Sequence, residues 1–225
     1  MASVTANQGI QRIATLEGPA QILAPKHTAL LVLDMQNDFC APGGKVFDSL
    51  GPKGSVIRAI VAPIRDLVAR ARECGLLTVY VQTMHLKGGV DESPAYISSL
   101  KAKGFQIGDE PNVVEGSWGH RIIDELAPPT DAVLVQKYNF DAFHNSLLDP
   151  VLRNYGVRSV LMVGAATYGV VLTTARTAFC RGYYVRVVKE CVAGYGEELN
   201  HAALKLMEGE LVSTEEVLRA WGYRS

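Results

Sequence analysis

The pattern that most constrains the fold is a regular alternation of short apolar runs with longer segments of helical periodicity. Apolar runs predict buried strands at 28–34, 76–82, 132–136, 159–164 and 184–188. Segments with apolar residues at helical spacing predict helices at 56–74, 146–155, 168–181, 197–207 and 214–221. Strands that alternate with helices are typical of a parallel sheet covered on both faces. We therefore predict an α/β fold, a three-layer αβα sandwich with a central, mostly parallel, Rossmann-like sheet.

The length of 225 residues fits a single domain. We place this domain at 27–225 and interpret residues 1–26 as a weakly periodic lead-in that lies over the surface. Residues 84–116 have no clear periodicity and are rich in Gly, Ser and Pro, and a long excursion of this kind often carries function. A short helix is expected at 117–126.

The composition excludes several classes of partner. Charged residues make up 20% of the chain and the formal net charge is −1, without a Lys- or Arg-rich block, so neither nucleic acid nor an anionic membrane is expected. We find no apolar run long enough for a membrane helix and no signal-peptide pattern, which predicts a cytoplasmic protein. The four cysteines have no metal-ligand spacing and are interpreted as reduced thiols: Cys40, Cys74, Cys180 and Cys191.

Three distant segments carry polar or special residues where predicted strands end. Asp34 ends the first strand, Lys137 follows the third, and the small-residue turn 164–170 follows the fourth and leads into a helix. In a parallel sheet with right-handed crossovers, the strand carboxyl ends share one edge, where ligands bind. A strand-to-helix turn also presents free N–H groups to an anion. The sequence therefore predicts an active site at this edge.

The residues at these strand ends resemble the motifs of the cysteine hydrolase, or isochorismatase-like, superfamily. The matching stretches are LVLDMQNDFCAPGG at 31–44, KYNFDAF at 137–143 and GAATYGVVLTTAR at 164–176. The resemblance implies a catalytic triad with Asp34 as general base, Lys137 as the second member, and a nucleophilic cysteine at position 170. This chain has Val170 there, and valine has no nucleophilic atom.

The resemblance also implies the remaining parts of the site. A cis peptide bond is expected between Ala165 and Ala166, with the N–H groups of Ala166 and Val170 forming an oxyanion hole. Candidate residues for substrate binding are three aromatic residues and four polar ones: Phe39, Phe140, Phe143, Gln36, Asn139, Tyr168 and Glu208.

Three explanations for Val170 stay open. It can be a substitution that leaves a substrate-trapping form of an otherwise intact amidohydrolase, which the intact motifs favour. It can mark a thiol-free hydrolase of the isochorismatase type, which uses aspartate and lysine on a vinyl ether. It can also mark a pseudoenzyme that binds a ligand or partner.

Within the superfamily, the glycine before position 170 and the long 84–116 excursion look most like hydrolases of ureido or carbamoyl compounds. Examples are biuret and triuret hydrolases, N-carbamoylsarcosine amidases and ureidoacrylate amidohydrolases. The stretch 83–91 has one histidine and lacks the Asp-x-His spacing of nicotinamidases, so no metal, no other cofactor and no pyridine carboxamide are expected. The resemblance further implies a homodimer or homotetramer.

Overall fold

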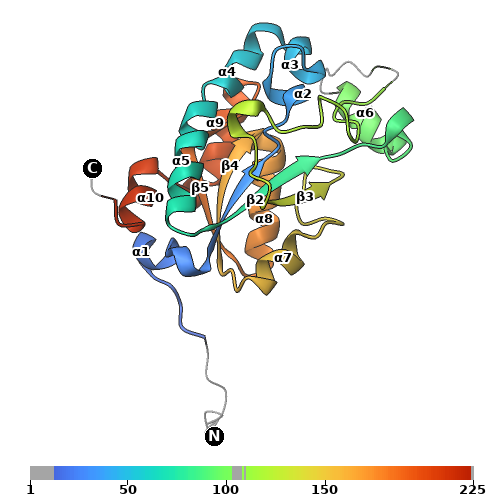
Figure 1. Cartoon of the computed structure of the whole chain (residues 1–225). Coiled ribbons are helices and arrows are strands. Elements are labelled where there is room, and N and C mark those ends of the chain that lie inside the picture. Colours follow the sequence, from blue (N-terminus) through green and yellow to red (C-terminus); the bar gives the residue numbers. More distant parts are fainter. Residues whose placement is uncertain (1–12, 103–107, 109, 224–225) are drawn as a thin grey trace, which may run out of the picture.

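A six-stranded, entirely parallel sheet forms the centre of the chain in the computed structural model, which describes residues 13–102, 108 and 110–223 (Figure 1). The strand order is β3-β2-β1-β4-β5-β6. The strands are β1 (Thr28–Leu33), β2 (Leu77–Thr83), β3 (Val133–Lys137), β4 (Ser159–Ala165), β5 (Tyr184–Ala193) and β6 (Leu211–Val212). The predicted fold class is confirmed, and only the two-residue strand β6 was not predicted.

Ten helices accompany the strands in the part of the chain that the structure describes. Before and after β1 are α1 (Gly18–Ile22), α2 (Asn37–Cys40), α3 (Lys45–Ser49), α4 (Ser55–Arg58) and α5 (Val61–Glu73). The others are α6 (Pro94–Ala102), α7 (Leu148–Asn154), α8 (Leu172–Cys180), α9 (Glu197–Leu206) and α10 (Thr214–Ala220). None of the described helices is long and apolar enough to span a membrane.

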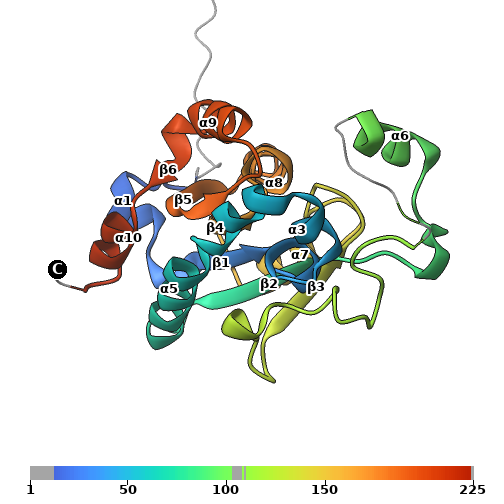
Figure 2. The ribbon, with the colours of Figure 1, turned by 90° about the horizontal axis from the view of Figure 1, so that it is seen from above.

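The sheet has a hydrophobic core on each face, which explains why its central strands are continuous apolar runs. In β1, Leu30 and Val32 pack into the core beneath α5 and α10, whereas Leu31 and Leu33 pack into the core beneath α7 and α8. Figure 2 shows α5 and α8 on opposite sides of the sheet, with α6 standing apart from both helix layers.

Several predicted elements differ from the observed ones. The predicted helix at 117–126 is wrong: a single turn, Asp124–Leu126, is present, because the preceding backbone pairs with the segment after β1 through Asn37 N–H to Arg121 O (2.9 Å) and Asp38 N–H to Gly119 O (3.0 Å). The predicted helix 56–74 is divided into α4 and α5, since Pro63 has no N–H to continue the ladder and suits a first turn.

The predicted lead-in is partly built into the domain. Ile22 and Leu23 are buried, and the Trp221 indole N–H donates to the Leu23 carbonyl (3.1 Å). Residues 1–12 of this lead-in lie outside the described residues. The predicted excursion 84–116 contains α6, and its residues 103–107 and 109 also lie outside the described part.

Strands β1 and β4 lie side by side, although the crossovers from them run in opposite directions. The three strands on one side of this boundary are β1, β2 and β3, and the three on the other are β4, β5 and β6. A boundary of this kind leaves an opening above the carboxyl ends of the two strands, which is where ligands bind in α/β sheets. Asp34 and the 164–170 turn follow these two strands.

Gly164 sets how closely β1 and β4 approach at this boundary. It pairs with Leu33, has a φ of 121°, and a Cβ added to it would lie 2.1 Å from the Leu33 carbonyl oxygen. We expect Gly164→Ala to lower the free energy of unfolding by about 3 kcal/mol, because the strands must separate. Urea unfolding measures this loss.

Gly156→Ala is the matched control. Its φ is 66° and nothing lies within 4 Å of an added Cβ. It therefore loses about 1 kcal/mol from the left-handed backbone alone. Equal losses in the two variants would contradict the close-approach explanation.

Candidate active site

The carboxyl ends of four neighbouring strands meet at one cavity of about 690 Å³. Asp34 follows β1, Thr83 ends β2, Lys137 ends β3, and Ala165 ends β4. All four line the cavity, together with Ala166 and Val170 from the turn that follows β4. The structure thus brings together the three segments that the sequence places at strand ends.

A buried lysine forms the floor of this cavity. Lys137 is 1% exposed, and its ammonium donates to Asp34 Oδ2 (2.8 Å), to the Asn139 carbonyl (2.9 Å) and to Thr83 Oγ1. These contacts use the three protons of the ammonium group. The Thr83 hydroxyl in turn donates to Asp34 Oδ2 (3.0 Å), so lysine, threonine and aspartate form a closed network.

Asp34 is held in an unusual conformation with one oxygen left unpaired. Its φ is 53°, a region that Asp tolerates better than most residues, and its N–H donates to the Val81 carbonyl (3.0 Å). Oδ1 is buried and has no hydrogen-bond partner among the described residues. Burial raises the pKa of Asp34 above its ordinary value, although Lys137 and Thr83 oppose this shift. This carboxyl group is therefore suited to take up or donate a proton.

The turn after β4 presents backbone rather than a nucleophile. The peptide bond between Ala165 and Ala166 is cis. The Ala166 carbonyl then accepts from the N–H groups of Gly169 (3.2 Å) and Val171 (3.3 Å) in a wide turn that leads into α8. The Val170 side chain lies in the cavity wall and is 6% exposed.

No cysteine is among the described residues that line the cavity. Cys40 is buried with its Sγ 3.7 Å from the Asp34 carbonyl, and burial, followed by the Asp34 charge, raises its pKa well above the ordinary value. Cys191 is also buried, and Cys180 lies exposed at the end of α8. These positions offer no thiolate to a ligand beside Asp34.

Four of the seven predicted substrate-binding residues line the cavity: Phe39, Asn139, Phe140 and Tyr168. The other three are not in its wall. Gln36 is fully buried, where its amide binds the Thr83 and His120 carbonyls (2.8 Å each) and accepts from the Thr83 N–H (2.8 Å), so it fixes the backbone of Thr83. Phe143 stacks on Tyr183 in the core, and Glu208 is exposed in a short turn after α9.

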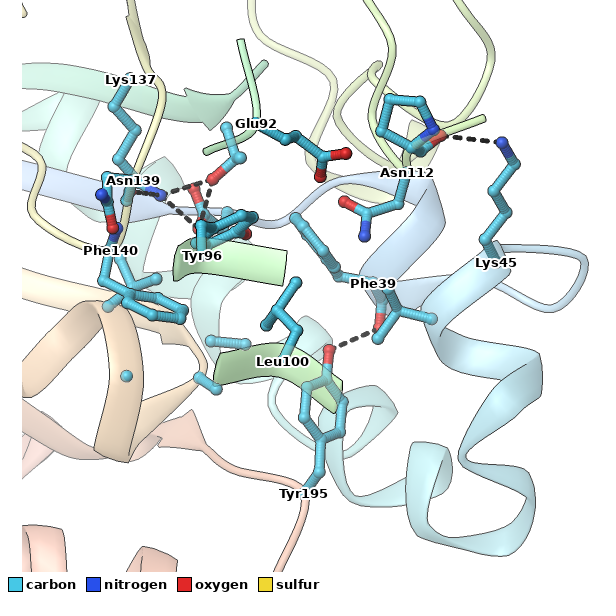
Figure 3. A pocket seen from close by; sticks show the side chains of 18 of the residues that line it. Phe39, Lys45, Glu92, Tyr96, Leu100, Asn112, Lys137, Asn139, Phe140 and Tyr195 are labelled. Carbon is cyan, nitrogen blue, oxygen red and sulfur yellow. Dashed lines mark hydrogen bonds and ion pairs between the residues drawn. The ribbon is translucent and has the colours of Figure 1, made fainter. Parts of the chain in front are cut away.

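The sequence interpretation missed several residues in the cavity wall. Thr83 was identifiable, because it directly follows the predicted strand 76–82 as Lys137 follows the predicted strand 132–136. Glu92, Tyr96 and Asn112 come from the segment without periodicity, and Figure 3 shows them on the wall beside Phe39. Burial, followed by the charges of the Glu92, Asp34 and Asp91 carboxylates, raises the pKa of Tyr96 to about 12.

No group of three or more metal-ligating side chains occurs in the described ranges. His85 and Asp91 form a pair, and their Nδ1 and Oδ2 atoms are 2.8 Å apart. Two ligands are fewer than a structural or catalytic zinc site uses.

Comparison with known proteins adds a family to this geometry. A family model described as the isochorismatase domain matches residues 28–216. The ureidoacrylate amidohydrolase RutB of Enterobacter sp. (strain 638) is 30% identical over 187 residues, which are 80% of this chain and 81% of that protein. A cysteine hydrolase structure from Pseudomonas syringae pv. phaseolicola 1448A superposes with a TM-score of 0.73 at 25% identity, covering 95% of this chain and 98% of that one. The N-carbamoylsarcosine amidase of Thermoplasma acidophilum shares the fold, with a TM-score of 0.65 at 24% identity over 83% of this chain and 95% of that one.

Removal of the buried lysine should make stability depend on pH. Lys137→Met leaves Asp34 buried without its cation, so we expect the free energy of unfolding to fall by about 3 kcal/mol near neutral pH. The Asp34 pKa then rises further in the folded state, while the unfolded value stays near about 4. In Lys137→Met the unfolded chain then loses the Asp34 proton at a lower pH than the folded chain does, so the free energy of unfolding falls as pH rises. Its difference from that of the unaltered chain should therefore grow above about pH 4.

Urea unfolding at a series of pH values measures this deficit. Lys189→Met is the control, because Lys189 is half exposed and its ion pair with Glu190 is long, at 3.9 Å, so its removal should cost little. A Lys137→Met deficit that stays constant with pH would contradict the assignment of the effect to Asp34.

Proposed function

The chain belongs to the isochorismatase family, and we propose that its cavity is an amidohydrolase-type site for a small ureido or carbamoyl compound. The observation that carries this proposal is the position of Val170, whose side chain lines the same cavity as the buried Asp34–Lys137 pair. A site with this pair retains the groups for proton transfer. Because the residue at position 170 is valine, the site binds its ligand without forming a thioester.

The charges in the cavity wall support a ligand that is not strongly anionic. Of the two lysines that line it, Lys137 is saturated by its three partners, and Lys45 donates to the carbonyls of Pro111 (2.8 Å) and Glu110 (3.4 Å). No arginine is among the described residues of the wall. Ureido compounds are planar and polar and match a small site with several hydrogen-bonding groups. The similarity to a ureidoacrylate amidohydrolase supports the ureido group of the ligand and not its other end, because ureidoacrylate itself ends in a carboxylate.

The proposed reaction assigns a role to each group in the cavity, and Val170 prevents its first covalent step. In a form with cysteine at position 170, Asp34 takes the thiol proton and the thiolate attacks the urea carbonyl carbon. The N–H groups of Ala166 and residue 170 hold the oxyanion. Asp34 returns the proton to the departing ammonia or amine, and water then hydrolyses the thioester. With Val170 the first bond cannot form, so binding is the last step.

Thiol-free proton transfer is a second candidate function, favoured by the unpaired Oδ1 and the raised pKa of Asp34. A protonated carboxyl group at this position can protonate a vinyl ether. Water, and not a protein side chain, then adds to the activated carbon, the C–O bond breaks, and a proton returns to Asp34. The cavity wall argues against isochorismate as the substrate, because its two carboxylates would face three carboxylates and two lysines among the described lining residues: Asp34, Glu92, Glu110, Lys45 and Lys137.

Restoring the thiol should restore turnover. We expect Val170→Cys to release ammonia from biuret or from another ureido compound that binds, because the change is nearly isosteric and the other groups are in place. A coupled ammonia assay and mass spectrometry of the trapped thioester measure this activity, and Asp34→Asn in addition should abolish it. Val170→Ser should be far less active, since a carboxylate is a weak base for a hydroxyl.

The matched control is Val171→Cys, which places the same thiol one residue away. Val171 is fully buried in the core and does not line the cavity, so this variant should stay inactive. If Val170→Cys folds and binds a ureido compound but releases neither ammonia nor amine, the amidohydrolase proposal fails and a binding role alone remains.

The chain with Val170 should not release pyruvate from isochorismate, for the charge reasons given above. Lactate dehydrogenase coupling detects pyruvate at low levels. Steady release that disappears in Asp34→Asn would make thiol-free hydrolysis the function of this site.

A further inference from the structure

Glu92 is a charged side chain in the cavity wall that the chemistry above does not use. Its side chain is 8% exposed and lines the cavity. Among the described residues its carboxylate receives no hydrogen bond. Its nearest cationic candidate is His85 Nε2, 3.9 Å away, and the Nδ1 atom of that histidine is already engaged with Asp91 (2.8 Å).

The Glu92 carboxylate faces the cavity without a donor from the described part of the chain, so its oxygens are left to accept hydrogen bonds from water or from a ligand. Figure 3 shows the Glu92 carboxylate directed into the cavity on the side of Asn112, whereas the Lys45 ammonium turns away to the Pro111 carbonyl. The space beside Glu92 is therefore a place where a ligand would supply the missing donor.

We propose that Glu92 determines the specificity of this cavity by accepting hydrogen bonds from N–H groups on the ligand. The ligand class is then a ureido compound with an amine, ammonium or second amide beyond the ureido carbonyl, and not one that ends in a carboxylate. This inference rests on the proposed function, since the ureido group is what binds beside Asp34. Hydrogen bonds to a charged acceptor are strong, and a second carboxylate beside Glu92 is repelled.

Three ureas with the same two-methylene linker test this specificity: 2-aminoethylurea, N-propylurea and 3-ureidopropionate. They share the ureido group and differ at the other end, which is cationic, neutral or anionic. Isothermal titration of the unaltered chain should give the tightest Kd for 2-aminoethylurea and the weakest for 3-ureidopropionate, at least tenfold apart. An equal or reversed order overturns the role of Glu92 without any variant.

Glu92→Gln then assigns the preference to one side chain. It should bring the Kd values of 2-aminoethylurea and 3-ureidopropionate to within about threefold and leave N-propylurea within about twofold. The matched control is Glu110→Gln, since Glu110 also lines the cavity but is exposed, and its Oε2 already accepts from the Gly88 N–H (3.2 Å). A merely structural role for Glu92 would weaken all three ureas together.

The outcomes separate the two proposals. If none of the three ureas nor biuret binds to the unaltered chain, the proposed function fails, and the specificity of Glu92 fails with it. If the ureas bind but Glu92→Gln leaves their ratio unchanged, only the role of Glu92 is overturned. Circular dichroism verifies that each variant is folded. If Glu92→Gln does not fold, the order of affinities in the unaltered chain decides the role of Glu92.

Discussion

The buried ammonium of Lys137 is the interaction on which the rest of the site depends. A charge at 1% exposure is tolerated only with a full set of partners, and its acceptors come from the residue after β1, the end of β2 and the loop after β3. These partners meet only if the three strands are parallel, in register and ended at the same level. The hydrogen bonds of Lys137 therefore depend on the register of the strands, and a shift of one strand would leave a buried charge unpaired.

The sequence predicted the part of the site that follows from strand ends. Asp34, Lys137 and Val170 were assigned to one edge because parallel strands place their carboxyl ends together. The orientation of side chains within a loop has no such rule. Phe143 lies in the core because its N–H is held by Asp141 Oδ1 (2.9 Å), and Gln36 turns away from the cavity to bind the Thr83 backbone. Glu92 and Asn112 were missed because residues 84–112 carry no periodic pattern from which a position can be inferred.

The cavity thus has two parts with different physical origins. The strand edge is rigid, since its side chains are bonded to one another and the strands approach closely at Gly164. The wall that includes α6 lies outside the helix layers, and Glu92 there receives no hydrogen bond from the described residues. Our two proposals assign the reaction chemistry to the first part and the choice of ligand to the second. They imply that changes in the segment after β2 alter the ligand while the Asp34–Lys137 pair stays intact.

The valine at position 170 also determines the result of labelling this chain with thiol-alkylating probes of the kind used to survey hydrolases. The accessible thiol in the neighbourhood is Cys180, exposed at the far end of α8. After cleavage at Arg176 and Arg181, a label on it would appear in the peptide 177–181, and position 170 would lie in the unlabelled peptide 159–176. The label would therefore mark an exposed cysteine at the end of α8. It would give no signal from the cavity, whether or not a ligand binds there.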